Sequence, residues 1–130
     1  MEKGRSWTPI ALGEEFPPPV GAYSPAARAG NLIFLSGQVP KDPHTGAVTG
    51  SDIRTQTRQV LANAERALNA AGATLEDVVA VTAYIARMDD WPDFDAEYRT
   101  ILRPPYPTRT TVGADLRGFL VEISLIAAVR

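Results

Sequence analysis

The chain has no cysteine and only one histidine, His44. A thiol nucleophile, a disulfide framework and a thiolate metal site are therefore excluded, and one imidazole cannot supply two histidine ligands. His44 lies in the Pro- and Gly-containing cluster of residues 40–46, where a solvated turn residue is expected. No arrangement fits a Ser-His-Asp triad, and no GxGxxG or GxxxxGK[ST] phosphate-binding string occurs. Few residue types that commonly carry out catalysis therefore remain as candidates.

Two other features are missing, an excess of positive charge and a long apolar run. The net charge of -2 and a pI near 5.3 argue against a nucleic-acid protein with a broad basic surface. No apolar run approaches the roughly 18 residues of a membrane span, and no signal peptide is visible, so a cytoplasmic location is expected. A length of 130 residues predicts one domain over residues 1–130.

Hydrophobic patterns predict alternating strands and helices after a proline-rich start. Residues 1–29 contain the only run of three consecutive prolines, at residues 17–19, and are interpreted as a linker or irregular loop. The predicted strands are residues 31–39, 78–86, 107–114 and 119–129. The first helix is capped by Ser51 or Asp52 and ends at Gly72; the second is capped by Asp89 or Asp90 and ends before residues 103–107. The last two strands are predicted to pair as an antiparallel hairpin.

These elements predict an α+β fold in which two helices cover one face of a mixed sheet. No helix remains to cover the other face, to which the pattern assigns Ile33, Leu35, Val81 and Ile123. Since monomeric proteins rarely expose such an apolar surface, a partner subunit is the simplest cover. The sequence therefore predicts an oligomer.

Arg109 is the most informative residue, because it stands alone in a short strand of threonine and valine. Its guanidinium fork suits a planar carboxylate. Glu122 lies in an apolar strand, where a carboxylate is costly unless it is paired or useful. If the last two strands pair as a hairpin, Glu122 approaches Arg109 or Thr111.

Two interpretations of this pair remain open. In the first, Arg109 and Glu122 form a structural ion pair with no ligand. In the second, Arg109 binds a substrate carboxylate and Glu122 holds a water molecule. Ser36 or the backbone amide of Gly37 then supplies further hydrogen bonds.

Several short strings, in this order and spacing, resemble the Rid (reactive intermediate deaminase) family, also called YjgF-type or L-PSP proteins. They are GAYSP at 21–25, GNLIFLSGQ at 30–38, TQTRQV at 55–60, NAAG at 69–72, PTRTTVG at 107–113 and LVEI at 120–123. The resemblance covers roughly residues 17–128 and points to the arginine-containing deaminase branch. It implies a chorismate-mutase-like fold and a homotrimeric barrel with sites in the clefts between subunits.

The implied activity is cofactor-free hydrolysis of small carboxylate-bearing enamines and imines, such as 2-aminoacrylate, 2-iminopropanoate and 2-iminobutanoate, to 2-keto acids and ammonia. Arg109 matches the arginine that binds the substrate carboxylate, and Glu122 matches the glutamate that positions or activates water. Tyr23 matches a loop tyrosine at the cleft, and Ser36 and Gly37 match its wall. Thr111 stands where several members have a cysteine that is not the nucleophile.

Two alternatives use the same fold. One is a non-catalytic regulatory protein that holds a 2-keto acid on Arg109 without turnover. The other is an endoribonuclease or translation inhibitor, which the acidic pI and the lack of a basic platform make less attractive.

Overall fold

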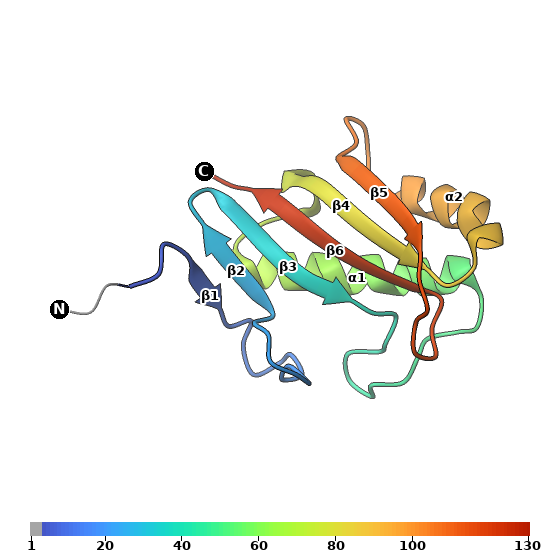
Figure 1. Ribbon diagram of the computed structural model, residues 1–130, viewed down its shortest axis with the longest axis horizontal. Coiled ribbons are helices and arrows are strands. Elements are labelled where there is room, and N and C mark those ends of the chain that lie inside the picture. The colour runs from blue at the N-terminus through green and yellow to red at the C-terminus, as the bar shows by residue number, and fades with distance from the viewer. Residues whose placement is uncertain (1–3) are drawn as a thin grey trace.

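The computed structural model describes residues 4–130, in which one mixed sheet packs against two helices (Figure 1). The strands are β1 (Thr8–Ile10), β2 (Ala26–Ala29), β3 (Leu32–Gln38), β4 (Val78–Ile85), β5 (Thr108–Gly113) and β6 (Val121–Ala128). The helices are α1 (Ile53–Ala71) and α2 (Trp91–Ile101). The strand order is β1-β2-β3-β6-β4-β5, and β4–β5 is the one parallel pair in it. Both helices lie on the same face, as predicted.

The predicted hairpin between the last two strands is wrong. β5 pairs with β4 in parallel, with Val81 opposite Arg109, whereas β6 pairs with the other edge of β4, with Tyr84 opposite Glu122. Helix α2 forms the crossover that parallel pairing of β4 and β5 requires. The apolar strand β6 lies between β3 and β4, where both of its edges are hydrogen-bonded.

The linker interpretation of residues 1–29 is also wrong in part. β1 and β2 extend the sheet beyond β3, with Ala26 opposite Leu35 and Thr8 opposite Arg28. These strands have three and four residues and little hydrophobic alternation. They are defined by the pairing of β2 with β3 and of β1 with β2, not by a local sequence pattern. Residues 1–3, which belong to the same predicted segment, lie outside the described part of the chain.

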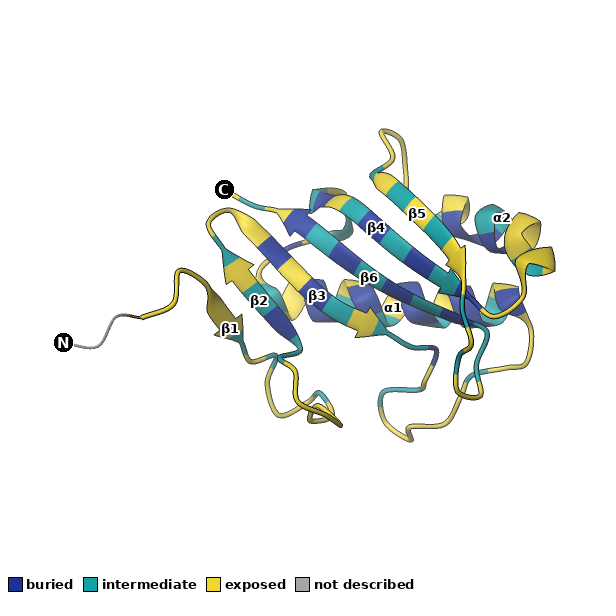
Figure 2. Cartoon of the chain, viewed as in Figure 1, coloured by how far each residue is buried: buried dark blue, intermediate teal, exposed yellow. Residues whose placement is uncertain are grey.

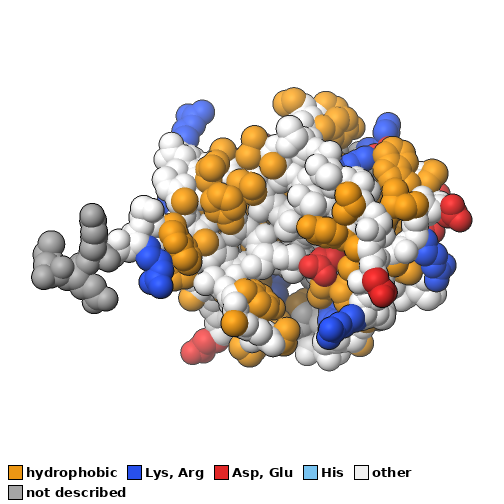
Figure 3. Space-filling view, viewed as in Figure 1, with side chains coloured by type: hydrophobic (Ala, Val, Ile, Leu, Met, Phe, Trp, Pro, Cys, Tyr) orange, Lys and Arg blue, Asp and Glu red, His pale blue; other side chains and the backbone are white. Residues whose placement is uncertain are grey.

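The sequence prediction assigned apolar strand residues to the wrong face of the sheet. The apolar residues assigned to the uncovered face are buried in the core, at 4% exposure or less: Ile33, Leu35, Val81 and Ile123. Leu32 and Phe34, which flank Ile33 on β3, and Val112 on β5 are 38–39% exposed, and exposed and buried positions alternate along β3 (Figure 2). A shift of one residue moves a whole strand pattern to the opposite face. Apolar side chains are visible on the face turned away from the helices (Figure 3), which leaves a surface that a second chain could cover.

Helix α1 has the boundaries that its sequence predicts. The Asp52 carboxylate accepts a hydrogen bond from the Thr55 amide at 3.0 Å, and Gly72 ends the helix in the left-handed region with φ of 95°. A stripe of fully buried side chains packs on the sheet: Val60, Leu61, Ala64 and Leu68. No helix within residues 4–130 is long and apolar enough to cross a membrane.

Shortening Leu61 to alanine is expected to lower the free energy of unfolding by about 2–5 kcal/mol, because the side chain is completely buried and its removal leaves a cavity. Leu61→Met nearly conserves the volume and should cost less than about 1.5 kcal/mol. Urea unfolding followed by circular dichroism measures both values. Equal losses for the two variants would contradict the packing role of Leu61.

Candidate functional site

Arg109 extends from the edge strand β5 toward helix α2. Its Nη1 atom lies 2.9 Å from Oδ1 of Asp95, and each side chain is 18% exposed. The guanidinium carbon lies 4.6 Å from the ring centre of Tyr98, 5.4 Å from that of Phe94 and 5.5 Å from that of Trp91. Three aromatic rings and one carboxylate therefore hold the charged group in place.

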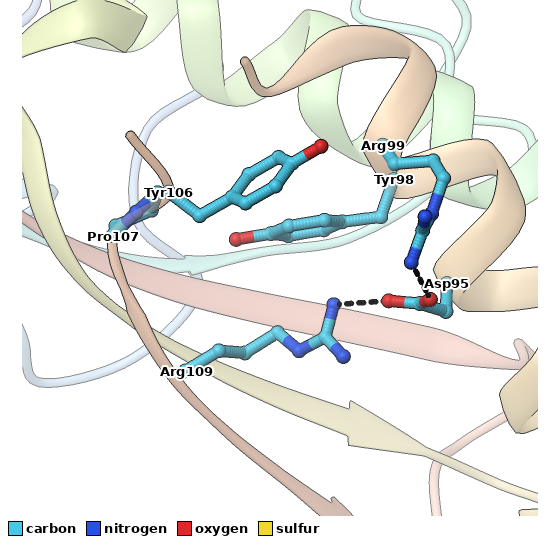
Figure 4. Close-up of a pocket in the computed structure, with 6 residues that line it drawn as sticks. All are labelled: Asp95, Tyr98, Arg99, Tyr106, Pro107 and Arg109. Carbon is cyan, nitrogen blue, oxygen red and sulfur yellow. Dashed lines mark hydrogen bonds and ion pairs between the residues drawn. The ribbon is translucent and has the colours of Figure 1, made fainter. Parts of the chain in front are cut away.

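Asp95 contacts both Arg109 and Arg99, which lies in the same helix as Asp95 (Figure 4). Its Oδ2 atom accepts a hydrogen bond of 2.8 Å from Arg99. Burial raises the pKa of Asp95, but the guanidinium groups of Arg99 and Arg109 outweigh this effect and hold the pKa below the usual value. Asp95 is therefore a carboxylate at neutral pH. The cluster borders a pocket of about 250 Å³, whose lining also includes Tyr98 and Tyr106.

Glu122 lies beside Gly37, where strand β3 has a bulge. A Cβ atom on Gly37 would collide with Oε2 of Glu122 and would lie 3.0 Å from its Cδ. A larger residue at position 37 would therefore displace the Glu122 carboxylate from its present position. Burial of the carboxyl group raises the pKa of Glu122, because the charged form loses hydration.

This pKa shift predicts a pH-dependent effect of Glu122→Gln on stability. Since the folded-state pKa is raised, the ionised side chain favours unfolding, and stability is lost as pH rises through the folded-state value. We therefore expect the variant to match the wild type near pH 4 and to have the higher melting temperature near pH 7. Calorimetric melts across this range measure the difference, and a gap that shrinks with rising pH would contradict the shift.

Ser36, Gly37 and Tyr23 line a second pocket, of about 480 Å³. The Ser36 hydroxyl donates a hydrogen bond of 2.7 Å to the carbonyl of Ser24, and its amide donates one of 3.1 Å to the carbonyl of Pro25. These bonds attach the loop that carries Tyr23 to the end of β3. Tyr23 itself is 51% exposed, so its ring is accessible at the surface.

The predicted site residues thus form two groups in one chain. Arg109 faces the helices, and Thr111, two residues along the strand, lies on the same face. Glu122 lies on the opposite face, where its neighbours Val121 and Ile123 point away from it into the core. Strand β4 also separates β5 from β6, which places their backbones about 10 Å apart. Of the two interpretations, the structural ion pair between Arg109 and Glu122 is therefore wrong within one chain, and the partner of Arg109 is Asp95.

Asp95 was not identified from the sequence. Phe94 and Tyr98 lie on the buried face of α2, and Asp95 follows the first of them and precedes Arg99 by four residues. That spacing signals an ordinary ion pair on a helix surface. The contact with Arg109 depends on how α2 crosses β5, for which no local pattern exists.

Metal-binding side chains do not converge in this structure: within residues 4–130 there is no group of three or more His, Asp or Glu residues suited to a metal ion. His44 is exposed, and the amides of His44 and Thr45 donate to the Asp42 carboxylate at 2.8 and 3.0 Å. This is the solvated turn that the sequence predicts.

Comparison with known proteins identifies the family. The family model described as Endoribonuclease L-PSP matches residues 13–129. A RutC family protein of Pyrococcus horikoshii is 41% identical over 120 residues, covering 91% of this chain and 95% of the relative. A protein of Dermatophagoides farinae named 2-iminobutanoate/2-iminopropanoate deaminase is 34% identical over 124 residues, covering 94% of this chain and 93% of its own.

Solved structures agree with this match. A Rid family protein of Yersinia pestis superimposes with a TM-score of 0.86 at 33% identity, covering 95% of this chain and 99% of its own. The chain therefore belongs to the L-PSP or Rid family, and its mixed sheet with two helices on one face is the fold of that family.

Proposed function

We propose that this protein hydrolyses small 2-imino acids and their enamines, such as 2-iminopropanoate and 2-iminobutanoate, to 2-keto acids and ammonia. The observation that carries this proposal is the fixed guanidinium of Arg109, which borders a pocket large enough for a molecule of this size. Arg109 binds the substrate carboxylate through charge-assisted hydrogen bonds. The relative named as a deaminase of these two imines supports the substrate class.

Glu122 supplies the second function, which is to hold and activate water. Water adds to the imine carbon, and one of its protons passes through the Glu122 carboxylate to nitrogen to give a carbinolamine. The hydroxyl proton of the carbinolamine then passes to nitrogen by the same route as the C–N bond breaks, which releases ammonia and leaves the keto acid. The raised pKa of Glu122 brings it closer to the range in which a carboxylate accepts and returns a proton. Because an imine is already electrophilic, orientation by Arg109 and modest acid-base help suffice for acceleration.

The position of these residues on opposite faces favours a site shared between subunits. In the proposed homotrimer, Arg109 of one subunit meets Glu122, Gly37, Ser36 and Tyr23 of another. The exposed apolar side chains of Leu32 and Phe34 lie on the sheet face that such a partner would cover. The site then has its carboxylate-binding group and its water-binding group in one cleft.

The test is to couple an amino-acid dehydratase, which releases the imine, to semicarbazide, which traps it. We expect the purified protein to lower the yield of imine-derived semicarbazone and to speed the formation of keto acid. Unchanged imine lifetime, together with Arg109-dependent binding of 2-oxobutanoate, would favour the non-catalytic binding protein instead. Unchanged lifetime with no such binding would reject both.

The family description also names an endoribonuclease. The net charge of -2 gives little general attraction to phosphates. RNA cleavage by highly purified protein that disappears in Glu122→Gln would support this activity, whereas cleavage that survives in the variant would point to a contaminant.

A further inference from the structure

Asp95 occupies a position between two guanidinium groups. Its Oδ1 atom lies 2.9 Å from Nη1 of Arg109, and its Oδ2 atom lies 2.8 Å from Nη2 of Arg99 (Figure 4). One negative charge is thus set against two positive charges, and the cluster has a net charge of +1. Both arginines and Asp95 line the same pocket.

The other acidic residues of α2 pair with arginines of α1 and do not change the net charge of this cluster. Asp93 forms an ion pair of 3.0 Å with Arg54, and Glu97 forms one of 3.2 Å with Arg58. Both of those arginines belong to α1. Among the ionised side chains of α2, Asp95 and Arg99 are therefore the ones that accompany Arg109 at the pocket.

A ligand carboxylate that binds Arg109 must share this arginine with Asp95. With a net charge of +1, the cluster compensates one carboxylate. No excess positive charge would remain for a second carboxylate on the ligand. That carboxylate would also be repelled by the nearby negative charge of Asp95. The 18% exposure of Asp95 and Arg109 limits screening by water.

We propose that Asp95 is a specificity-determining residue that restricts the Arg109 pocket to ligands with one negative charge, so that 2-imino and 2-keto monocarboxylates are preferred over dicarboxylates. This inference rests on the proposed function, in which Arg109 holds the substrate carboxylate. Asp95 acts by its charge on the ligand and by its contact with Arg109, without taking part in bond formation.

The test compares binding of 2-oxobutanoate and 2-oxoglutarate to the full-length protein by isothermal titration calorimetry. Asp95→Asn keeps the shape and one acceptor oxygen but removes the charge. We expect it to shift the ratio of the two affinities about tenfold toward the dicarboxylate, as loss of one nearby negative charge requires. Asp93→Asn, a charge removal on the same helix outside the pocket, is the matched control and should leave the ratio unchanged.

Arg99→Gln provides an independent measurement, because Arg99 is 61% exposed and its replacement changes charge at a solvated position. It removes one positive charge and should shift the ratio in the opposite direction. A merely structural role of Asp95 would change both affinities together and leave their ratio unaltered. Melting temperatures of all variants verify that each is folded.

The outcomes separate this inference from the function on which it rests. If the wild type binds neither keto acid, or if Arg109→Ala binds them equally well, both proposals fail. If binding requires Arg109 but neither Asp95→Asn nor Arg99→Gln moves the ratio, the carboxylate role of Arg109 stands and the specificity role of Asp95 is rejected.

Discussion

Arg109→Ala is expected to lower kcat/KM for 2-iminobutanoate hydrolysis at least about a hundredfold, which corresponds to roughly 3 kcal/mol of transition-state stabilisation. The guanidinium is fixed by Asp95 and by the ring of Tyr98 before any ligand arrives. Its loss removes the charge that binds the substrate and the contact that orients the imine carbon toward water. The dehydratase-coupled assay described above measures the effect.

Two controls separate catalysis from folding in this experiment. Arg54→Ala removes another arginine paired with an aspartate of α2, at 3.0 Å, but on an exposed surface, and should keep activity within about twofold. Arg109→Lys keeps the positive charge without the planar fork, and its activity should lie between those of the wild type and Arg109→Ala. If the folded alanine variant kept more than about a third of the activity, Arg109 would have no essential part in the reaction.

Helix α1 illustrates what could be predicted from the sequence. Asp52 and Gly72 act within one turn of the helix ends, and the apolar spacing between them is strong, so local chemistry determines both limits. The two-layer arrangement also followed from the sequence, since two amphipathic helices and several apolar strands bury their surfaces best in this way.

Strand pairing was less predictable, because it depends on contacts between distant segments. The short connection after β5 favoured a hairpin with β6, yet pairing on the two sides of β4 gives both strands a buried neighbour. The same error affected the site. Glu122 was expected beside Arg109 through that hairpin, whereas the actual partner, Asp95, reaches it from α2 across the helix-sheet interface.

Because Arg109 and Glu122 lie on opposite faces of the sheet, two inactive variants that each lack one of these residues should complement each other in mixed oligomers. Arg109→Ala and Glu122→Gln should each have about 1% of wild-type activity or less, in keeping with loss of a binding charge and of an acid-base group. Co-expression at equal levels should produce mixed oligomers in which some sites combine the intact Arg109 of one chain with the intact Glu122 of another. If each site takes these residues from two different subunits, about a quarter of the sites are complete by random assortment, and activity rises to about 25% of the wild type.

Purified mixed oligomers, separated by two different affinity tags, allow the activity per site to be measured. In a mixed trimer one of the three sites is complete, so the purified sample should have about a third of the wild-type activity. The variants mixed without subunit exchange provide the baseline and should show only the sum of their residual activities. A site built within one chain gives a different result, because every chain in the mixed oligomer lacks one of the two residues and recovery would be zero. The strand order favours the shared site, since β4 separates β5 from β6 and the two side chains leave the sheet in opposite directions. Recovery near a third in the purified mixed trimers, or near a quarter in the unseparated mixture, would therefore assign Arg109 and Glu122 to the same reaction and to different subunits at once.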